Sequence, residues 1–184
     1  MKVALLRHGD TAWSAEGRIQ GRSDIALSEQ GRAALRHLQV PGGMRVACSP
    51  LRRCVETAEA LGHPHAVREP RLIEMSWGAW EGRRLAELRD ELGHAMQANE
   101  ARGWDFRPEG GESPREVLAR VRGWLMELKE PTLAVTHRGV IRAVFAEASG
   151  WDMLGRPPVK LDWAALHFFT VTQGVVAIHR LNVR

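Results

Sequence analysis

Two apolar stretches of the chain end in a histidine that could do chemistry. Residues 3–6 lead directly into Arg7-His8-Gly9, and residues 131–136 lead into His137-Arg138-Gly139. Imidazole has an ordinary pKa of about 6.5, so a large fraction is neutral near pH 7 and can act as a nucleophile or a base. We interpret His8 as a nucleophile. The alternative is that Arg7 and His8 are merely polar residues at the end of a strand.

Arginine and glutamate side chains elsewhere in the chain could complete such a site. Arg52 and Arg53 follow another short apolar run, and a guanidinium can grip phosphate or carboxylate oxygens in a bidentate fork. Helical periodicity does not choose between these two arginines. Glu74 could act as an acid if burial raises its pKa against the lowering effect of nearby arginines. Taken alone, Glu74 would be interpreted as one half of a salt bridge.

Composition favours a globular protein with an anionic ligand. The 184 residues are close to the usual size of one domain, so we expect residues 1–184 to form a single domain. The net charge is +4 and the sequence pI is about 9.8, with arginine far more frequent than lysine. The basic residues are scattered among acidic ones, with no Lys/Arg block. The sequence therefore does not favour nucleic acid as a partner, and a nucleic-acid-binding function would rest on the pI alone.

Cysteine usage and the N-terminal sequence bear on location. Cys48 and Cys54 do not suggest a disulfide framework, which fits a reduced cytoplasmic protein. The sequence reaches Arg7 after only a few apolar residues, and no apolar run approaches the eighteen or so residues of a membrane span. We expect neither secretion nor a membrane partner.

Strand and helix patterns alternate along the chain. Strands are expected at residues 3–6, 45–49 and 131–136, with a short extended piece at 65–68 and a hairpin of 163–171 and 175–181. Helices are expected at 28–39, at 50–61 with Ser49 as N-cap, at 85–102, at 114–128 with a capping box begun by Ser113, and at 140–149. This order predicts an α/β fold, a three-layer α/β/α sandwich with a mostly parallel central sheet and an antiparallel edge strand.

Three of the predicted parallel strands are followed by polar residues. Arg7-His8, Ser49 with the arginine pair, and His137-Arg138 each come directly after a strand. The carboxyl ends of parallel strands meet at one edge of a sheet, where ligands of such folds bind. We therefore expect these side chains to converge on one site.

Several motifs, in one order and at one set of intervals, resemble those of the histidine phosphatase superfamily, the phosphoglycerate-mutase-like group. The resemblance covers nearly the whole chain. It rests on Arg7-His8-Gly9, on Ser49, Leu51, Arg53, Thr57 and Ala58, on Glu74 ahead of Gly78 and Gly82, on Gly111-Glu112-Ser113, and on Thr136-His137-Arg138-Gly139. It implies that His8 becomes phosphorylated and that Arg7, Arg53 and His137 cradle the phosphoryl group. It also implies that Glu74 protonates the leaving oxygen and then activates water.

Further residues are expected to contact substrate. The substrate-binding set is Thr11, Ser14, Gln20, Gly21, Arg138 and Gly139. Family members commonly have Asn where this chain has Ser14, so a hydroxyl is kept and an amide is lost. Glu112-Ser113 could touch substrate or only cap a helix. Arg83 and Arg84 could bind a substrate carboxylate or only be solvated at a helix start.

The resemblance implies a metal-independent phosphatase that hydrolyses small phosphomonoesters without a cofactor. The eight histidines show no metal-ligand spacing such as His-Glu-x-x-His. The alternatives are a cofactor-dependent phosphoglycerate mutase, which is generally longer in this family, and a non-catalytic module that binds phosphorylated ligands. The sequence does not identify the small phosphorylated metabolite that serves as substrate, and it leaves open a monomer or a homodimer.

Overall fold

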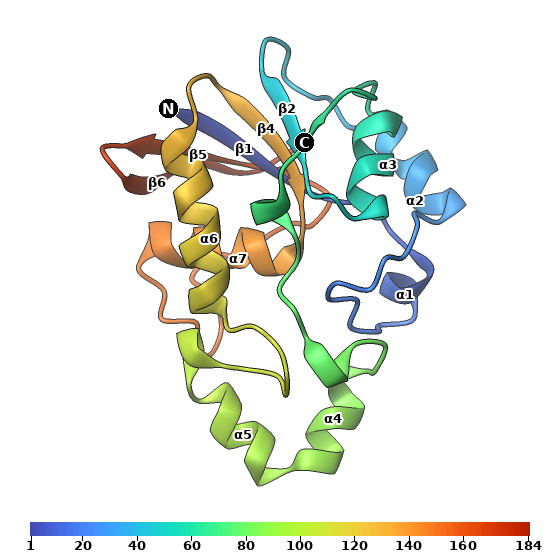
Figure 1. Ribbon diagram of the computed structural model, residues 1–184, viewed down its shortest axis with the longest axis vertical. Helices are drawn as coiled ribbons and strands as arrows, with labels where there is room; N and C mark the ends of the chain where they lie inside the picture. The colour runs from blue at the N-terminus through green and yellow to red at the C-terminus, as the bar shows by residue number, and fades with distance from the viewer.

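Four parallel strands and an antiparallel hairpin form a six-stranded sheet. The structure is a computed structural model that describes residues 1–184. Its strand order is β3-β2-β4-β1-β5-β6, and Figure 1 shows β1, β4 and β2 side by side. The bounds are Lys2–Arg7 for β1, Arg45–Cys48 for β2, Val67–Arg68 for β3, Thr132–Thr136 for β4, Leu166–Thr172 for β5 and Val175–Val183 for β6. β5 runs antiparallel to β1 and forms a hairpin with β6, so the predicted α/β fold with a mostly parallel sheet is confirmed.

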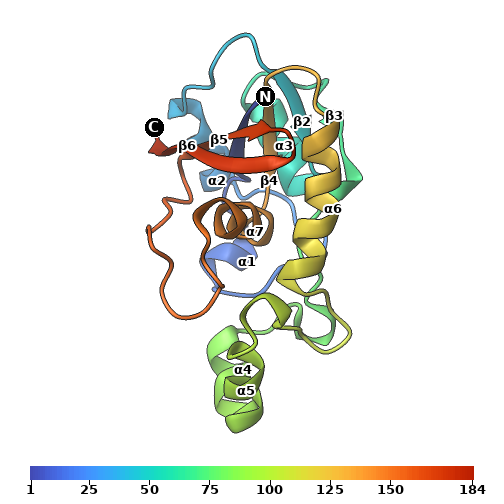
Figure 2. The ribbon, with the colours of Figure 1, turned by 90° about the vertical axis from the view of Figure 1, so that its left-hand side faces the viewer.

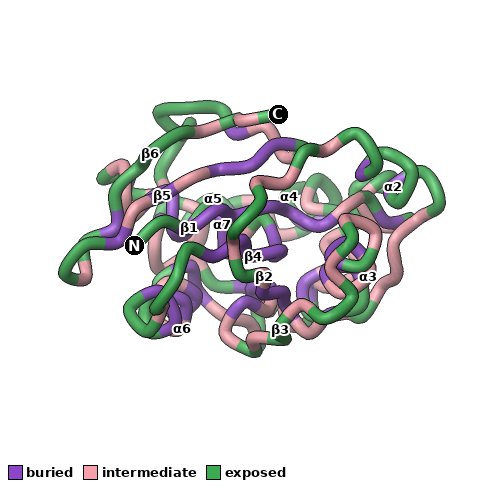
Figure 3. Tube along the Cα trace, turned by 90° about the horizontal axis from the view of Figure 1, so that it is seen from above, coloured by how far each residue is buried: buried purple, intermediate pink, exposed green.

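Both faces of the sheet are covered by helices, because its central strands are apolar on both sides. Val3 and Leu5 of β1 pack in one cluster with α6 (Pro114–Glu127) and α7 (Arg138–Ser149). Ala4 and Leu6 face the other way, toward α3 (Arg52–Ala60). Figure 2 shows α6 and α7 together on one part of the sheet, and Figure 3 shows the buried stretches of β1 and β4 in the middle of the molecule.

Local sequence signals explain where these elements begin and end. Ser113 begins α6 with the expected capping box, in which its hydroxyl accepts from the amide of Glu116 and the Glu116 carboxylate accepts from the amide of Ser113. α7 ends at Gly150, whose φ of 71° is the left-handed conformation that favours glycine. The expected hairpin is confirmed, with Gln173 and Gly174 between β5 and β6 at φ values of 50° and 80°.

Three predicted helices differ from the observed ones. The helix expected at 28–39 is α2 (Glu29–Ala34) followed by a 3-10 turn, Leu35–His37. Ser49 is not an N-cap: α3 begins at Arg52 after Leu51. The helix expected at 85–102 is broken at Gly93, whose φ is 49°, into α4 (Leu85–Leu92) and α5 (His94–Glu100).

The α4–α5 hairpin lies at the end of the molecule farthest from the sheet (Figure 1). A small separate cluster of Trp80, Leu88 and Met96 holds it together. The remaining short elements are α1 (Ala12–Ala15) and the 3-10 turns Pro70–Leu72, Gly78–Trp80 and Gly103–Asp105. None of the helices has the length and apolar character needed to span a bilayer.

Candidate active site

The carboxyl ends of β1, β2 and β4 bring three polar residues together. Arg7 of β1 is paired in register with Thr136 of β4, and the amide of His8 donates to the Thr136 carbonyl over 2.9 Å. The amide of Ser49 donates to the carbonyl of Val135, also over 2.9 Å. His8, Ser49 and His137 are therefore neighbours, each one residue beyond the end of its strand.

His8 is held with one ring nitrogen bonded and the other free. Its Nδ1 lies 2.7 Å from the carbonyl oxygen of Gly9, which can only accept, so Nδ1 carries the proton. Nε2 therefore keeps its lone pair. Burial, followed by the positive charges of Arg7 and Arg53, holds the pKa of His8 well below its usual range. Neutral imidazole is the form required of a nucleophile.

His137 lies directly behind His8. The two ring centroids are 5.2 Å apart, and the His137 Nε2 lies 2.7 Å from the hydroxyl oxygen of Ser49. That oxygen also accepts from the amide of Leu51 over 3.4 Å. Burial and the charge of Arg53 lower the pKa of His137 as well. Ser49 thus orients the second histidine instead of capping α3.

The structure separates the two candidate arginines that periodicity could not. The Arg53 side chain is fully buried and donates to the backbone carbonyls of Ser23 and Gly21 over 2.7 and 2.6 Å. Its buried Nε has no protein partner. Arg52 is 61% exposed and pairs with Glu56 on the outside of α3. Arg53 therefore offers a free donor inside the molecule.

Arg7, the last residue of β1, supplies a second cation beside Arg53. It is buried, and its guanidinium lies 3.2 Å from a carboxylate oxygen of the exposed Asp10. The amide of Gly9 donates to the Thr57 hydroxyl on α3, and this hydroxyl donates to the carbonyl of Arg53. The strand that positions Arg7 and the helix that positions Arg53 are thus joined through Thr57.

Glu74 lies in the loop between the 3-10 turns Pro70–Leu72 and Gly78–Trp80, and its side chain reaches the same site. Its carboxylate oxygens accept from the amides of Met75 and Gly139 over 2.8 and 3.2 Å. Burial raises the pKa of Glu74, while these two hydrogen bonds and the charge of Arg53 oppose the shift. A β-carbon at Gly139 would lie only 2.4 Å from the Glu74 carboxylate, so glycine is required for this approach.

Two other glutamates organise the surrounding loops. Glu81 accepts from the amides of Arg22, Ser23 and Trp77 and from the Ser23 hydroxyl, which fixes the loop whose carbonyls hold Arg53. Glu112 binds Arg120 over 2.9 and 3.0 Å. Sequence reasoning missed Glu81, and it left Glu112 between a capping role and a substrate contact.

A cavity of about 650 Å³ opens beside these residues. Members of the expected site line it, together with α4, α5 and the segment after α7. From the expected sets these are Arg7, His8, Arg53, Glu74, Ser14, Gln20, Gly21, Arg138 and Gly139. His137 lies behind His8, outside the lining.

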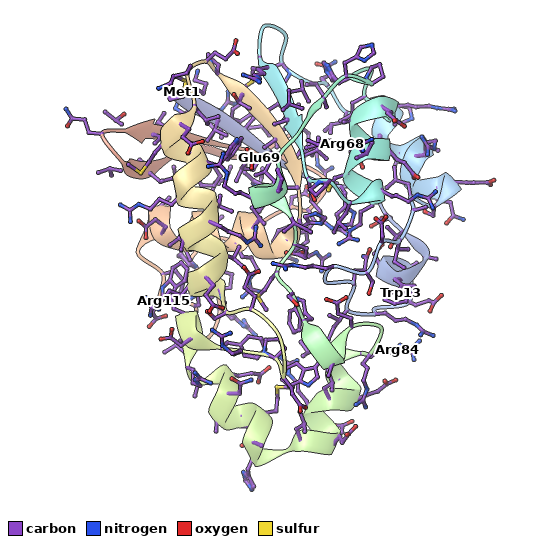
Figure 4. All side chains as sticks on the ribbon, viewed as in Figure 1. Met1, Trp13, Arg68, Glu69, Arg84 and Arg115 are labelled. Carbon is purple, nitrogen blue, oxygen red and sulfur yellow. The ribbon has the colours of Figure 1, made fainter.

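Three residues that the sequence suggested as substrate contacts bond to other parts of the protein. Thr11 is fully buried and caps α1, where its hydroxyl accepts from the amide of Ser14. The Ser14 hydroxyl in turn bonds to the backbone of Thr11. Arg84 donates to the carbonyl of Glu16 and lies on the side of the molecule near Trp13 (Figure 4), outside the cavity.

Sequence reasoning missed four charged residues of the cavity wall: Arg18, Arg89, Glu100 and Arg142. Arg142 lines it one helical turn after Arg138 on α7. The spacing of four residues places both side chains on one helix face, so the pattern Arg138-x-x-x-Arg142 after the second histidine could have revealed it.

Comparison with known proteins agrees with this geometry. The family model of the histidine phosphatase superfamily (branch 1) matches residues 3–184. A glucosyl-3-phosphoglycerate phosphatase of Mycobacterium tuberculosis is 33% identical, over 84% of this chain and 80% of that protein. Phosphoserine phosphatase 1 of Hydrogenobacter thermophilus is 29% identical, over 83% of this chain and 78% of that protein.

Solved structures show the same fold. A mycobacterial glucosyl-3-phosphoglycerate phosphatase in complex with VO3 superimposes with a TM-score of 0.81 at 29% identity, covering 100% of this chain and 99% of the other. The TTHB049 protein of Thermus thermophilus gives 0.79 at 31% identity, with both chains covered completely.

The chain belongs to the histidine phosphatase superfamily, branch 1, as the motifs predicted. Its relatives include named phosphatases and a probable phosphoglycerate mutase from Cronobacter sakazakii, which is 36% identical over 68% of this chain and 61% of that protein. The expectation of a phosphatase of this superfamily is confirmed.

Proposed function

We propose that this chain hydrolyses small phosphomonoesters through a phosphohistidine formed on His8, within a single domain of residues 1–184. The observation that carries the proposal is the bond from Nδ1 of His8 to the Gly9 carbonyl, which leaves Nε2 free beside two buried arginines. A site with this geometry offers a neutral nucleophile and fixed positive charge for a phosphoryl group.

In the first step, Nε2 of His8 attacks phosphorus and the bond from phosphorus to the ester oxygen breaks. Glu74 gives its proton to the departing oxygen, so the products are an alcohol and phosphohistidine. The raised pKa of Glu74 supports this role, because the carboxyl must begin protonated.

In the second step, the Glu74 carboxylate takes a proton from water as the water oxygen attacks phosphorus. The bond from phosphorus to Nε2 breaks, inorganic phosphate leaves, and both Glu74 and His8 return to their starting states. One difficult hydrolysis is thereby divided into two displacements.

Positive charge for both steps comes from Arg7 and Arg53, whose unpartnered Nε suits a phosphoryl oxygen. His137 completes the cradle as a neutral donor. We propose no metal or cofactor, and no group of three or more His, Cys, Asp or Glu side chains is placed to hold a metal ion.

The substrate-binding residues are a separate set. In it, Ser14, Gln20, Gly21, Arg138 and Gly139 contact substrate, and Thr11 acts through Ser14. The buried Gln20 Oε1 has no partner and can accept from a substrate hydroxyl.

The two named phosphatase relatives act on phosphoserine and on glucosyl-3-phosphoglycerate by their names, and we propose a small phosphorylated metabolite here too. A cytoplasmic location is proposed from the two free, buried cysteines. The experiment is a screen of phosphorylated metabolites for phosphate release. It is run beside conversion of 3- to 2-phosphoglycerate with and without bisphosphoglycerate. Efficient mutase turnover with negligible hydrolysis would contradict the proposal.

A further inference from the structure

The cavity is larger than the phosphoryl site alone requires. Its volume of about 650 Å³ lies within the range of roughly 300–1,000 Å³ found for sites that enclose a whole small molecule. Beyond His8 and Glu74 its walls continue along α7 and across to α4 and α5. The walls beyond the reacting atoms are therefore available to contact the leaving group of the substrate.

Six arginines line this cavity, and two of them have no polar partner in the protein. Four are engaged: Arg7 with Asp10, Arg18 with Glu16, Arg89 with Glu100, and Arg53 with two carbonyls. Arg138 and Arg142 form no ion pair and no hydrogen bond with any protein group, and both remain accessible to solvent. Two cations on one helix face that have no protein partner can bind an anion.

Tryptophan side chains hold these two guanidinium groups in place. The Arg138 guanidinium carbon lies 5.0 Å from the ring centroid of Trp163, and that of Arg142 lies 5.2 Å from the ring of Trp151. An aromatic face attracts the cation but leaves its N–H donors free to bind oxygen atoms. The donors are thus positioned before any ligand arrives.

The two arginines follow one another along the cavity wall from the point where α7 meets Glu74. Arg138 is the first residue of α7 and directly precedes Gly139, whose amide donates to the Glu74 carboxylate over 3.2 Å. Arg142 is one turn further along the same helix face, and Glu74 is a charged neighbour of both arginines. Glu74 is the group proposed to protonate the leaving oxygen, so both arginines lie on the leaving-group side of the site.

We propose that Arg142, assisted by Arg138, binds a second anionic group carried by the leaving group, so that preferred substrates are phosphomonoesters with a carboxylate or a second phosphate. This inference rests on the proposed phosphatase function and names its substrate class. A guanidinium stacked on tryptophan presents a planar edge of donors, which matches a carboxylate or phosphate in bidentate geometry.

Matched substrate pairs test the proposal. 3-Phosphoglycerate and glycerol 3-phosphate differ only by a carboxylate in place of a hydroxymethyl group. Fructose 1,6-bisphosphate and fructose 6-phosphate differ by a second phosphate. Charge-assisted hydrogen bonds contribute about 1.5–3 kcal/mol, which corresponds to roughly ten- to hundredfold in kcat/KM. We expect the wild type to prefer the more anionic member of at least one pair by about tenfold or more, and the preferred pair identifies the anion.

The variant R142Q should lose most of that preference, with a fall in kcat/KM about tenfold larger for the anionic substrate than for its partner. R142K keeps the charge without the planar fork and should retain part of the preference. R122Q is the matched control, since Arg122 is an exposed arginine of α6 that lies outside the cavity and pairs with Glu147, and its preference ratio should stay near that of the wild type.

Two results would overturn the inference: no preference in the wild type for either anionic substrate, or an R142Q loss equal for both members of the preferred pair. Failure of the proposed function is distinguishable, because it would abolish phosphate release from p-nitrophenyl phosphate by the wild type. With that release intact, an absent preference refutes only the assignment of Arg142.

Discussion

Nδ1 of His8 lies 2.7 Å from the carbonyl oxygen of Gly9, one residue further along the chain. A carbonyl cannot donate, so this contact alone places the proton on Nδ1 and the reactive lone pair on Nε2. The same backbone turn that ends β1 therefore selects the tautomer of the nucleophile. In histidine enzymes the group bonded to one ring nitrogen commonly sets the role of the other.

The first prediction concerns the protonation of His8. Its pKa is held well below 6.5 by burial and by Arg7 and Arg53, so the ring of the free enzyme should remain neutral as the pH falls through 6.5. Titration of ring-labelled histidine by NMR measures this, with the H8N variant to assign the signal. The pKa of His137 is also lowered, chiefly by burial, so its ring should remain neutral over the same pH range. A His8 signal that titrates at or above pH 6.5 would contradict the account of the site.

The second prediction concerns Glu74. The pKa of this carboxyl is raised, so its proton is lost as the pH rises through that value, and hydrolysis of an alkyl phosphate should fall there. E74Q should remove this dependence and lower turnover by about 10²–10⁴. p-Nitrophenolate leaves without a proton, so E74Q should still release one equivalent of it in a burst and then stall as phosphoenzyme. Steady turnover of E74Q near the wild-type rate would refute the acid–base assignment.

The third prediction tests the close approach of α7 to Glu74. G139A places a β-carbon 2.4 Å from the Glu74 carboxylate and 3.1 Å from the Met75 side chain, so the carboxylate must shift. We expect a loss of activity toward alkyl phosphates of about tenfold or more. Its control is G123A on the exposed face of α6, where the added carbon meets nothing nearer than 3.9 Å. G123A should keep full activity and stabilise the helix by about 0.5–1 kcal/mol, as thermal unfolding would report.

The fourth prediction concerns Glu81, which does not itself line the cavity. Its carboxylate fixes the loop whose Gly21 and Ser23 carbonyls hold Arg53. E81Q replaces one of the two acceptor oxygens with a donating NH2 group and should misplace Arg53, weakening inhibition by inorganic phosphate about tenfold. E87Q provides the control, because Glu87 is an exposed partner of Arg84 in α4 and such pairs contribute little. Equal phosphate inhibition in E81Q and E87Q would remove the positioning role.

Sequence patterns predicted the frame of this molecule better than its irregular parts. The runs that became β1, β2 and β4 are apolar on both faces, and polar residues follow each, so both the parallel sheet and the meeting of His8 with His137 could be expected. Gly93 breaks α4 from α5 through a positive φ, a choice that helical periodicity does not register. Glycine is tolerated in a helix at modest cost, so the break depends on tertiary packing.

Ser49 shows a different limit of sequence reasoning. Serine before proline predicts a helix N-cap, but the buried His137 competes for the same hydroxyl and takes it at 2.7 Å. The partner is 88 residues away in the chain, so no local pattern contains it. Glu81 was missed for the same reason, since a loop anchor is defined by what folds against it. Arg142 was missed although its spacing of four residues from Arg138 is visible in the sequence.

The most direct test of the central claim is to trap the phosphoenzyme. Brief incubation with p-nitrophenyl phosphate labelled at phosphorus, whose leaving group needs no proton, with E74Q used to slow hydrolysis, should yield one stable labelled site per chain, lost in acid and kept in base as expected for phosphohistidine. Peptide mapping should place it on His8, and H8A in the E74Q background should take up no label while remaining folded by thermal unfolding. Label on another residue, or undiminished label in the H8A background, would contradict the account.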